Sequence, residues 1–286
     1  MMDVVLRRGR PEDAGECGRI AREAFKSIAD QHNFPNDFAV GRDPVAVATA
    51  LLRHPHVYSV VAELDGRIVG SNFTDERSTI AGIGPITVDP SVMNRTIGRR
   101  MMLDAMERVR SRKVPGVRLV QIAYHYRSLS LYTKLGFDTR ETLSAMFGPT
   151  LERRTPEYQV RPATDADVEA CDRLCRGVHG HDRDGELRDA VASGAARVVE
   201  HLGEITGYAT GIGWGSHAVG ATNEELKALI SDTSTIQRPG FLVPTRNGEL
   251  MRWCFGNGFR ITSQATLMTV GLYNEPNGSW LPSILY

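Results

Sequence analysis

Apolar and polar residues follow two different periods along this chain, and the two periods predict a mixture of strands and helices. Strand-like runs fall near residues 4–8, 57–74, 79–88 and 117–124, and the second of them is a hairpin that turns at Asp65-Gly66. Helical patterns lie between them, near 12–29, 43–53, 98–112 and 128–135. One more strand is expected after Phe137. This order of elements predicts a mixed α/β fold.

The same pattern recurs in the second half of the chain. Three ordered matches carry the repeat: Arg7, Asp13 and Cys17 with Arg161, Asp167 and Cys171 at an offset of 154, residues 63–70 with 200–207 at 137, and 136–137 with 258–259 at 122. A falling offset predicts two copies of one fold, the second of them 32 residues shorter. The alternative is chance similarity between βα units. The charged segment 151–156, which ends in proline, separates the expected domains 1–150 and 157–286.

Composition excludes some classes of partner. The 286 residues include 34 Lys+Arg and 34 Asp+Glu, so no bulk positive field exists to gather nucleic acid or an anionic membrane. No window approaches 18 consecutive apolar residues, and the first residues lack the apolar core of a signal peptide, so we expect a cytoplasmic protein. The four cysteines are expected to be buried core thiols.

A strand–loop–helix turn between Val88 and Arg100 is a candidate anion site. A β-type run ends at Asp89-Pro90, and a helix begins near Gly98 among Arg95, Arg99 and Arg100. Backbone N–H groups at a helix N-terminus are unpaired and point outward, and the helix dipole adds positive potential there. The arginines suit a pyrophosphate. The alternative is an ordinary helix start, which any such unit requires.

Together with a second segment, this turn resembles the acetyl-CoA motif of the Gcn5-related N-acetyltransferase (GNAT) superfamily. Arg95 and Gly98 match the family's Arg/Gln-x-x-Gly-x-Gly/Ala run, although Thr96 and Arg100 stand where the family favours small residues. Downstream, Leu131-Tyr132 and Gly136-Phe137 match the family's Leu-Tyr-x-x-x-Gly-Phe. The resemblance implies two GNAT-like domains of tandem type, each with a mixed, mostly antiparallel sheet flanked by helices, and a splayed parallel strand pair in the first.

The resemblance also implies a site. Acetyl-CoA would lie in the gap between the strands that end near Val88 and Tyr124, because open backbone groups there can pair with pantetheine amides. Tyr132 would be the general acid that protonates the departing thiolate. The expected cofactor-binding residues are Ile86, Thr87, Val88, Arg95, Thr96, Ile97, Gly98, Arg99, Arg100 and His125.

The general base stays open at this point. His125 could contact the cofactor or act as a base at a near-neutral pKa, and a plain strand-end histidine is the alternative. Asp75 and Glu76 could anchor an amine or be surface charges. The run from His179 to Asp184 has no strong metal-ligand spacing, so no metal is expected. The apolar tail suggests docking. The resemblance to tandem GNAT enzymes implies that the terminal carboxylate, at Tyr286, could enter the active site as a base, and a purely structural docking or an oligomer contact is the alternative.

Only the first copy retains both the Arg-x-x-Gly run at the helix start and the tyrosine at position 132. In the second copy no Arg-x-x-Gly run follows the hairpin, Glu224 and Glu225 occupy the first helical turn, and Cys254 stands where Tyr132 would fall. The sequence therefore predicts an acetyl-CoA-dependent N-acetyltransferase that acts by direct attack of a primary amine, in a small molecule or peptide, on the thioester. The alternative is a non-catalytic protein that binds CoA or a metabolite. A homodimer is a possible assembly, and the acceptor is not identified.

Overall fold

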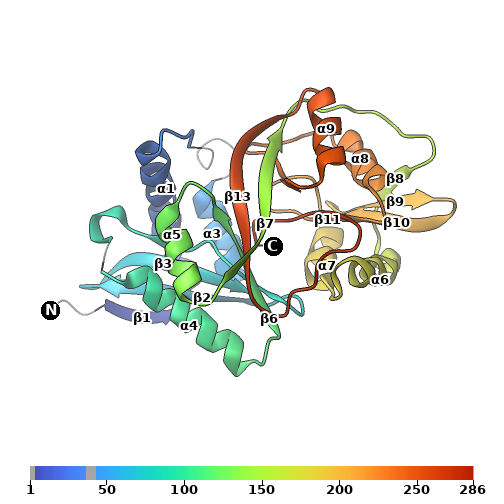
Figure 1. Cartoon of the computed structure of the whole chain (residues 1–286). Coiled ribbons are helices and arrows are strands. Elements are labelled where there is room, and N and C mark those ends of the chain that lie inside the picture. Colours follow the sequence, from blue (N-terminus) through green and yellow to red (C-terminus); the bar gives the residue numbers. More distant parts are fainter. Residues whose placement is uncertain (1–3, 37–42, 94, 286) are drawn as a thin grey trace.

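The computed structural model describes residues 4–36, 43–93 and 95–285. Figure 1 shows the first half of the chain, in blue to green, beside the second half, in yellow to red. The elements of the first half are β1 (Val4–Arg8), α1 (Ala14–Gln31), α3 (Pro44–Arg53), β2 (Val57–Leu64), β3 (Arg67–Asp75), β4 (Ala81–Ile83), β5 (Thr87–Val88), α4 (Ile97–Ser111), β6 (Gly116–Ile122), α5 (Tyr126–Lys134) and β7 (Asp138–Phe147). They follow the predicted order, except that the expected strand over 79–88 is broken into β4 and β5.

The second half repeats much of this order. Its elements are β8 (Gln159–Pro162), α6 (Val168–His179), α7 (Asp184–Ala192), β9 (Arg197–His201), β10 (Glu204–Ala209), β11 (Ala218–Gly220), α8 (Asn223–Asp232), β12 (Phe241–Pro244), α9 (Gly248–Gly256), β13 (Arg260–Gly271) and β14 (Ser279–Leu281). Short 3-10 turns at Pro11–Asp13, Pro90–Val92 and Asp165–Asp167 introduce helices. The turns Pro11–Asp13 and Asp165–Asp167, each near the start of its copy, occupy equivalent places at an offset of 154, as the sequence repeat predicts.

Two sheets form the framework. The larger has the order β1-β2-β3-β4-β6-β13-β7-β12, with β5 paired to β3, and the smaller has the order β14-β11-β10-β9-β8. Among the described strands, β4 and β6 are the one parallel pair, and the other pairings are antiparallel. The mixed, mostly antiparallel fold with one parallel pair in the first copy is therefore confirmed.

The larger sheet contains strands from both halves of the chain. β13, from the second half, pairs with both β6 and β7 of the first half, and β12 pairs with the other edge of β7. In Figure 1 the long red and green strands β13 and β7 run side by side through the middle of the molecule. The division into domains 1–150 and 157–286 stays a prediction from the sequence, because strands from both sides of this boundary share one hydrogen-bonded sheet.

The repeat extends to individual ion pairs. Arg7 binds Asp13 at 2.7 Å and Glu63 at 2.8 Å, and Arg161 binds Asp167 and Glu200 at 2.7 Å each. The aspartate of each cluster also accepts a hydrogen bond from a backbone N–H. Asp13 accepts it from Arg10, and Asp167 accepts it from Thr164. Each cluster ties a first strand, a helix start and a hairpin together.

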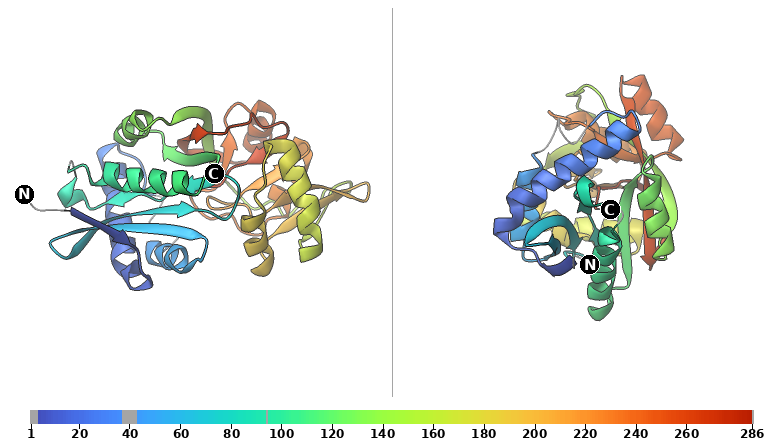
Figure 2. Two further views of the ribbon diagram at one scale, coloured as in Figure 1. Left: turned by 90° about the horizontal axis from the view of Figure 1, so that it is seen from below. Right: turned by 90° about the vertical axis from the view of Figure 1, so that its left-hand side faces the viewer.

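The two halves also contact each other outside the sheet. Arg77 after β3 binds Asp189 on α7 at 2.8 Å, and Asp182 accepts hydrogen bonds from Thr79. The chain end returns to the junction, and the left view of Figure 2 shows it between the two lobes. There the Leu285 carbonyl lies so close to Gly82 of β4 that a Cβ atom at this glycine would clash with it. The apolar tail is therefore docked, as expected, while Tyr286 lies outside the described residues.

The helices cover the sheets with apolar faces. All four cysteines are buried free thiols, as predicted. Among the described residues, no helix is both long and apolar enough to cross a membrane.

Candidate functional site

The strand pair β4–β6 separates soon after it begins. Ala81 pairs with Val117 and Gly82 with Arg118, and the two strands have no pairing beyond that point. β5 continues along β3, with Gly70 opposite Val88 and Ser71 opposite Thr87, whereas β6 continues along β13. No strand in the described parts of the chain pairs with the edge of β5 that faces β6. This open backbone edge at residues 86–88 is the gap that the sequence predicted.

The helix that follows this edge begins without a side-chain cap. Thr96, the residue that precedes α4, has φ 61°, a left-handed conformation that glycine adopts at no steric cost. No side chain of a described residue accepts a hydrogen bond from the first turn of α4. The N–H groups of this turn are thus available to an anion. The left-handed backbone also explains why a glycine would be favoured where this chain has Thr96.

The arginines in and beside α4 divide into two groups. Arg108 binds Glu76 at 2.8 Å, and Arg110 and Arg112 also pair with glutamates. Arg95, Arg99 and Arg100, at the helix start, form no ion pair with any described residue. A Cβ atom at Gly98 would make ordinary van der Waals contacts with Val88 at 3.7 Å and Leu131 at 3.9 Å, so this glycine packs between the end of β5 and α5. The residues present therefore fit a diphosphate.

Tyr132 is buried on the inner face of α5. Its side chain is 7% exposed and belongs to the same apolar cluster as Ala81 and Ile83 of β4 and Phe137. Its hydroxyl donates no hydrogen bond to a described residue. Burial raises the pKa of Tyr132 well above the ordinary value, so the phenol keeps its proton throughout the physiological range. Such a group can donate a proton and cannot act as a base at neutral pH.

His125 differs from the sequence expectation. It precedes α5, and its carbonyl accepts hydrogen bonds from Gln121 and Ser128. Burial lowers the pKa of His125 to about 4, instead of the near-neutral value expected for its type. The ring is therefore neutral at physiological pH, and the near-neutral base considered from the sequence is wrong.

Asp75 and Glu76 are engaged in ion pairs. Both oxygens of Asp75 accept hydrogen bonds from Arg77, and Glu76 binds Arg108 at 2.8 and 2.9 Å. Asp75 lies opposite Gly82, where β4 is still paired with β6, and thus away from the opening at β5. Neither carboxylate is placed as a base beside the open edge. His181 and Asp182 belong to the junction between the halves, where Asp182 holds Thr79.

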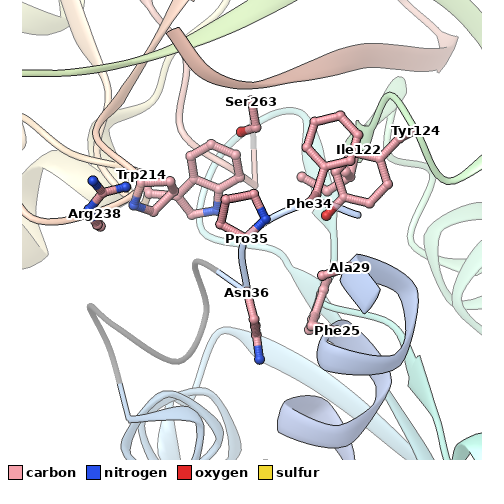
Figure 3. A pocket seen from close by; sticks show the side chains of 11 residues that line it. Phe25, Ala29, Phe34, Pro35, Asn36, Ile122, Tyr124, Trp214, Arg238 and Ser263 are labelled. Carbon is pink, nitrogen blue, oxygen red and sulfur yellow. The ribbon is translucent and has the colours of Figure 1, made fainter. Parts of the chain in front are cut away.

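A pocket opens beyond the free end of β6, and the sequence reasoning did not identify it. Figure 3 shows its side chains, which come from α1 and the segment after it, from the end of β6, and from the second half of the chain. The pocket encloses about 640 Å³ when the space open to solvent is counted. Its walls are mostly apolar and are formed by Phe25, Ala29, Phe34, Pro35, Asn36, Ile122, Tyr124, Trp214, Arg238, Pro239 and Ser263. Long-range packing creates this pocket, so local sequence patterns carry no signal for it.

The equivalent place in the second copy is closed. Gly207 of β10, the repeat of Gly70, lies opposite Gly220 of β11, just as Gly70 lies opposite Val88 of β5. In β5 the edge away from β3 is open. The equivalent edge of β11 is paired with β14, with Trp280 opposite Val219. The chain itself therefore occupies the gap in the second copy.

The helix start of the second copy is closed as well. Glu225 of α8 accepts hydrogen bonds from the N–H and the hydroxyl of Thr222, and Thr222 in turn caps the N–H of Glu224. A carboxylate of the protein thus stands where α4 leaves room for an anion. Glu224 and Glu225 both lie in the first turn of this helix, as the sequence predicts.

Comparisons with known proteins agree with this geometry. Residues 23–137 match the model of the acetyltransferase (GNAT) family. This match agrees with the resemblance to the GNAT acetyltransferases that the sequence predicted. Acetyl-CoA as the co-substrate is consistent with it. A search of curated protein sequences gives no match.

Solved structures show that the likeness in fold extends over nearly the whole chain. A putative acetyltransferase from Pyrococcus horikoshii is 17% identical, with a TM-score of 0.73 over 96% of this chain and 94% of its own. A GCN5-related N-acetyltransferase from Sphaerobacter thermophilus is 13% identical, with a TM-score of 0.60 over 95% and 96%. A tandem GNAT protein from the clavulanic acid biosynthesis pathway is 14% identical, with a TM-score of 0.56 over 94% and 98%.

Proposed function

We propose that the protein is an acetyl-CoA-dependent N-acetyltransferase in which the first copy, residues 1–150, binds the cofactor and catalyses transfer to a primary amine. The observation that carries the proposal is the open backbone edge of β5 together with the uncapped, basic start of α4, the next α-helix in the chain. The second copy, residues 157–286, has both features closed by its own chain. It is a degenerate domain that completes the sheet and contributes to the pocket.

The cofactor contacts follow from this edge. Backbone groups of Ile86, Thr87 and Val88 would pair with the pantetheine amides, as a neighbouring strand would. The N–H groups of Ile97, Gly98 and Arg99 would bind the diphosphate, with Arg95 and Arg100 beside them. His125 is half-buried and its pKa is lowered to about 4, so its part is a contact and not a base.

The chemistry needs a proton donor at the leaving group. Acetyl-CoA supplies the acetyl group as a thioester, which an amine can attack directly. A C–N bond then forms and the C–S bond breaks, and Tyr132 donates its phenolic proton to the departing thiolate. The raised pKa of Tyr132 keeps the proton available for each turnover. The proton that the amine nitrogen loses as the amide forms returns through solvent to the Tyr132 phenolate, which restores the phenol.

The acceptor would enter from the pocket of Figure 3. Ile122 and Tyr124 stand at the free end of β6, so the pocket adjoins the gap between β5 and β6. A cytoplasmic location is part of the proposal, consistent with four free, buried thiols.

Replacement of Tyr132 by phenylalanine tests the proposal. Thiol release from acetyl-CoA is measured across a panel of amines, and the Kd of CoA is measured by calorimetry. Tyr132→Phe should lower kcat at least ~10-fold, because general acid catalysis typically contributes about 10²–10⁴-fold, with the Kd of CoA unchanged. Tyr126→Phe is the matched control, since Tyr126 lies on the same helix and is 66% exposed. Near-normal turnover by Tyr132→Phe would exclude its role. CoA binding by the wild type without thiol release for any amine would favour the binding-protein alternative.

A further inference from the structure

The acceptor pocket contains a buried hydrogen-bond donor. Trp214 lies in the loop between β10 and β11 of the second copy, and only 7% of its surface is exposed. Its indole Nε1–H has no hydrogen-bond partner in the described parts of the chain. A buried donor without a partner is unfavourable, because it has lost its hydrogen bonds to water and gained none in return. A ligand oxygen in the pocket could accept this hydrogen bond, and binding would then recover that cost.

On the basis of the proposed function, we propose that the acceptor is a monoamine carried on an aromatic or bulky apolar group, with a carbonyl oxygen that accepts a hydrogen bond from Trp214. The second copy thereby supplies the group that recognises the acceptor, although it performs no chemistry itself.

The walls of the pocket favour a flat apolar group. The rings of Phe34 and Tyr124 stack with centroids 4.2 Å apart and planes at 12°, so an aromatic pair lines one side of the pocket. Phe25 of α1 and the indole of Trp214 line other parts of it, as Figure 3 shows. An aromatic group that packs on such walls gains apolar burial and ring contacts.

Charge disfavours a polycationic acceptor. None of the described residues that line the pocket is a carboxylate, and the charged side chain among them is that of Arg238. The Arg238 guanidinium lies over the ring of Phe147, 4.6 Å from its centroid. A second ammonium group on the acceptor would lose its hydration in this pocket and would lie near the guanidinium of Arg238. No carboxylate among the described lining residues would compensate for that loss. Polyamines should therefore be poor acceptors.

The same apolar lining has a chemical consequence. Transfer from water into an apolar pocket lowers the pKa of an amine, because the charged form loses its hydration. The neutral, nucleophilic form of the acceptor is then populated near neutral pH. The acceptor amine can therefore be deprotonated without a carboxylate base, and none of the described residues that line the pocket is a carboxylate.

Three amines separate the features of the proposal. L-phenylalaninamide has the aromatic ring and the carbonyl oxygen, phenethylamine has the ring alone, and spermidine has neither. The kcat/KM of thiol release is measured for each with the wild type, Trp214→Phe and Trp253→Phe. Trp253 is the matched control, because it lies on α9, packs against the apolar core of the second copy and does not line the pocket. Binding of N-acetyl-L-phenylalaninamide to the CoA complex is measured by calorimetry, which requires no turnover.

The wild type should use L-phenylalaninamide about fivefold better than phenethylamine, as expected for one net hydrogen bond of about 1 kcal/mol, and should use spermidine least. Trp214→Phe should bring the first two amines to equal kcat/KM, while Trp253→Phe keeps the difference. Preferred use of spermidine, or an unchanged ratio in a folded Trp214→Phe variant, would overturn the inference and leave acetyl transfer standing. If thiol release is absent but the acetylated amide binds, and binds more weakly to Trp214→Phe, the proposed function fails while the recognition by Trp214 holds. If neither binding nor use of the amide is seen, the inference is wrong.

Discussion

Leu143 of β7 and Ala265 of β13 lie directly opposite each other in the antiparallel pair at the centre of the larger sheet. They are also equivalent residues of the two copies, since 122 residues separate them, the offset that relates α5 to α9. On either side, Ile122 pairs with Ala265 and Pro244 pairs with Leu143, which are again equivalent contacts. A pseudo-twofold axis therefore passes through this residue pair, and each copy lends its last long strand to the other.

This exchange predicts that the first copy cannot stand alone. Residues 1–150 contain β6 and β7 but not β13, which pairs with both of them. Two exposed strand edges with buried side chains should then drive association. Residues 1–150, expressed alone, should elute as aggregates or as a strand-exchanged dimer in size-exclusion chromatography with light scattering. A stable monomer with a cooperative thermal transition would show that β13 is dispensable.

The repeated ion-pair cluster predicts equal losses of stability in the two copies. Removing the guanidinium of Arg7 or Arg161 leaves a largely buried carboxylate, Asp13 or Asp167, without its main partner. Arg7→Met and Arg161→Met should each lower the free energy of unfolding by about 2 kcal/mol. Urea denaturation measures this change.

A control for those variants is available on α6. Arg173 is exposed and pairs with Glu169 within the helix, so Arg173→Met should change the free energy by less than about 0.5 kcal/mol. Losses of the same size in all three variants would show that the clusters have no special role.

The two groups of arginines on α4 should differ in cofactor affinity. Arg99 stands at the helix start without an ion pair to a described residue, whereas Arg110, further along, pairs with Glu107. Arg99→Ala should raise the KM for acetyl-CoA by about tenfold, equivalent to the loss of about 1.4 kcal/mol of charge-assisted binding. Arg110→Ala should leave it unchanged. The KM for acetyl-CoA is measured by steady-state kinetics at fixed ionic strength. Equal increases in KM for both variants would mean that the arginines attract the cofactor only through the overall positive charge of the helix.

Buried histidines predict that acid destabilises the fold. Burial lowers the pKa of His125, His181 and His217 to about 4, below the ordinary value of about 6.5 in the unfolded chain. The unfolded state therefore takes up more protons between these values, so this contribution is intact above pH 6.5 and falls as the pH drops toward 4. The Tm should decrease by roughly 5 °C or more from pH 7.5 to pH 5.

Replacing one of these rings tests the cause. His125→Gln should reduce the decrease in Tm, whereas His56→Gln, at an exposed position, should not. A Tm that is constant from pH 7.5 to pH 5 would mean that these histidines are not held neutral by the fold.

Local patterns were sufficient for the elements and for the cofactor turn. The period of apolar residues located α4, β6 and α5, and the motif around Arg95 and Gly98 marked a helix start that the structure leaves uncapped. The falling offset of the repeat identified equivalent residues, down to the partners of Arg7 and Arg161. These features depend on residues that are close in sequence or on pairs that recur in both copies.

The rest depends on contacts between distant segments. Alternation along β13 shows which side chains face the core, but not that Ala265 pairs with Ile122 of the other copy. In the same way, no local signal brings Trp214 to the pocket that contains Phe34. The low pKa of His125 follows from burial, which the residue type alone does not reveal.

The central claim is that one copy of the fold binds acetyl-CoA and the other is closed by its own chain. Isothermal titration of the full-length protein with acetyl-CoA tests this claim most directly. The account predicts a single site per chain, at which Arg99→Ala weakens binding, while Glu225→Gln leaves both the stoichiometry and the affinity unchanged. Two sites per chain, or no binding at all, would contradict it.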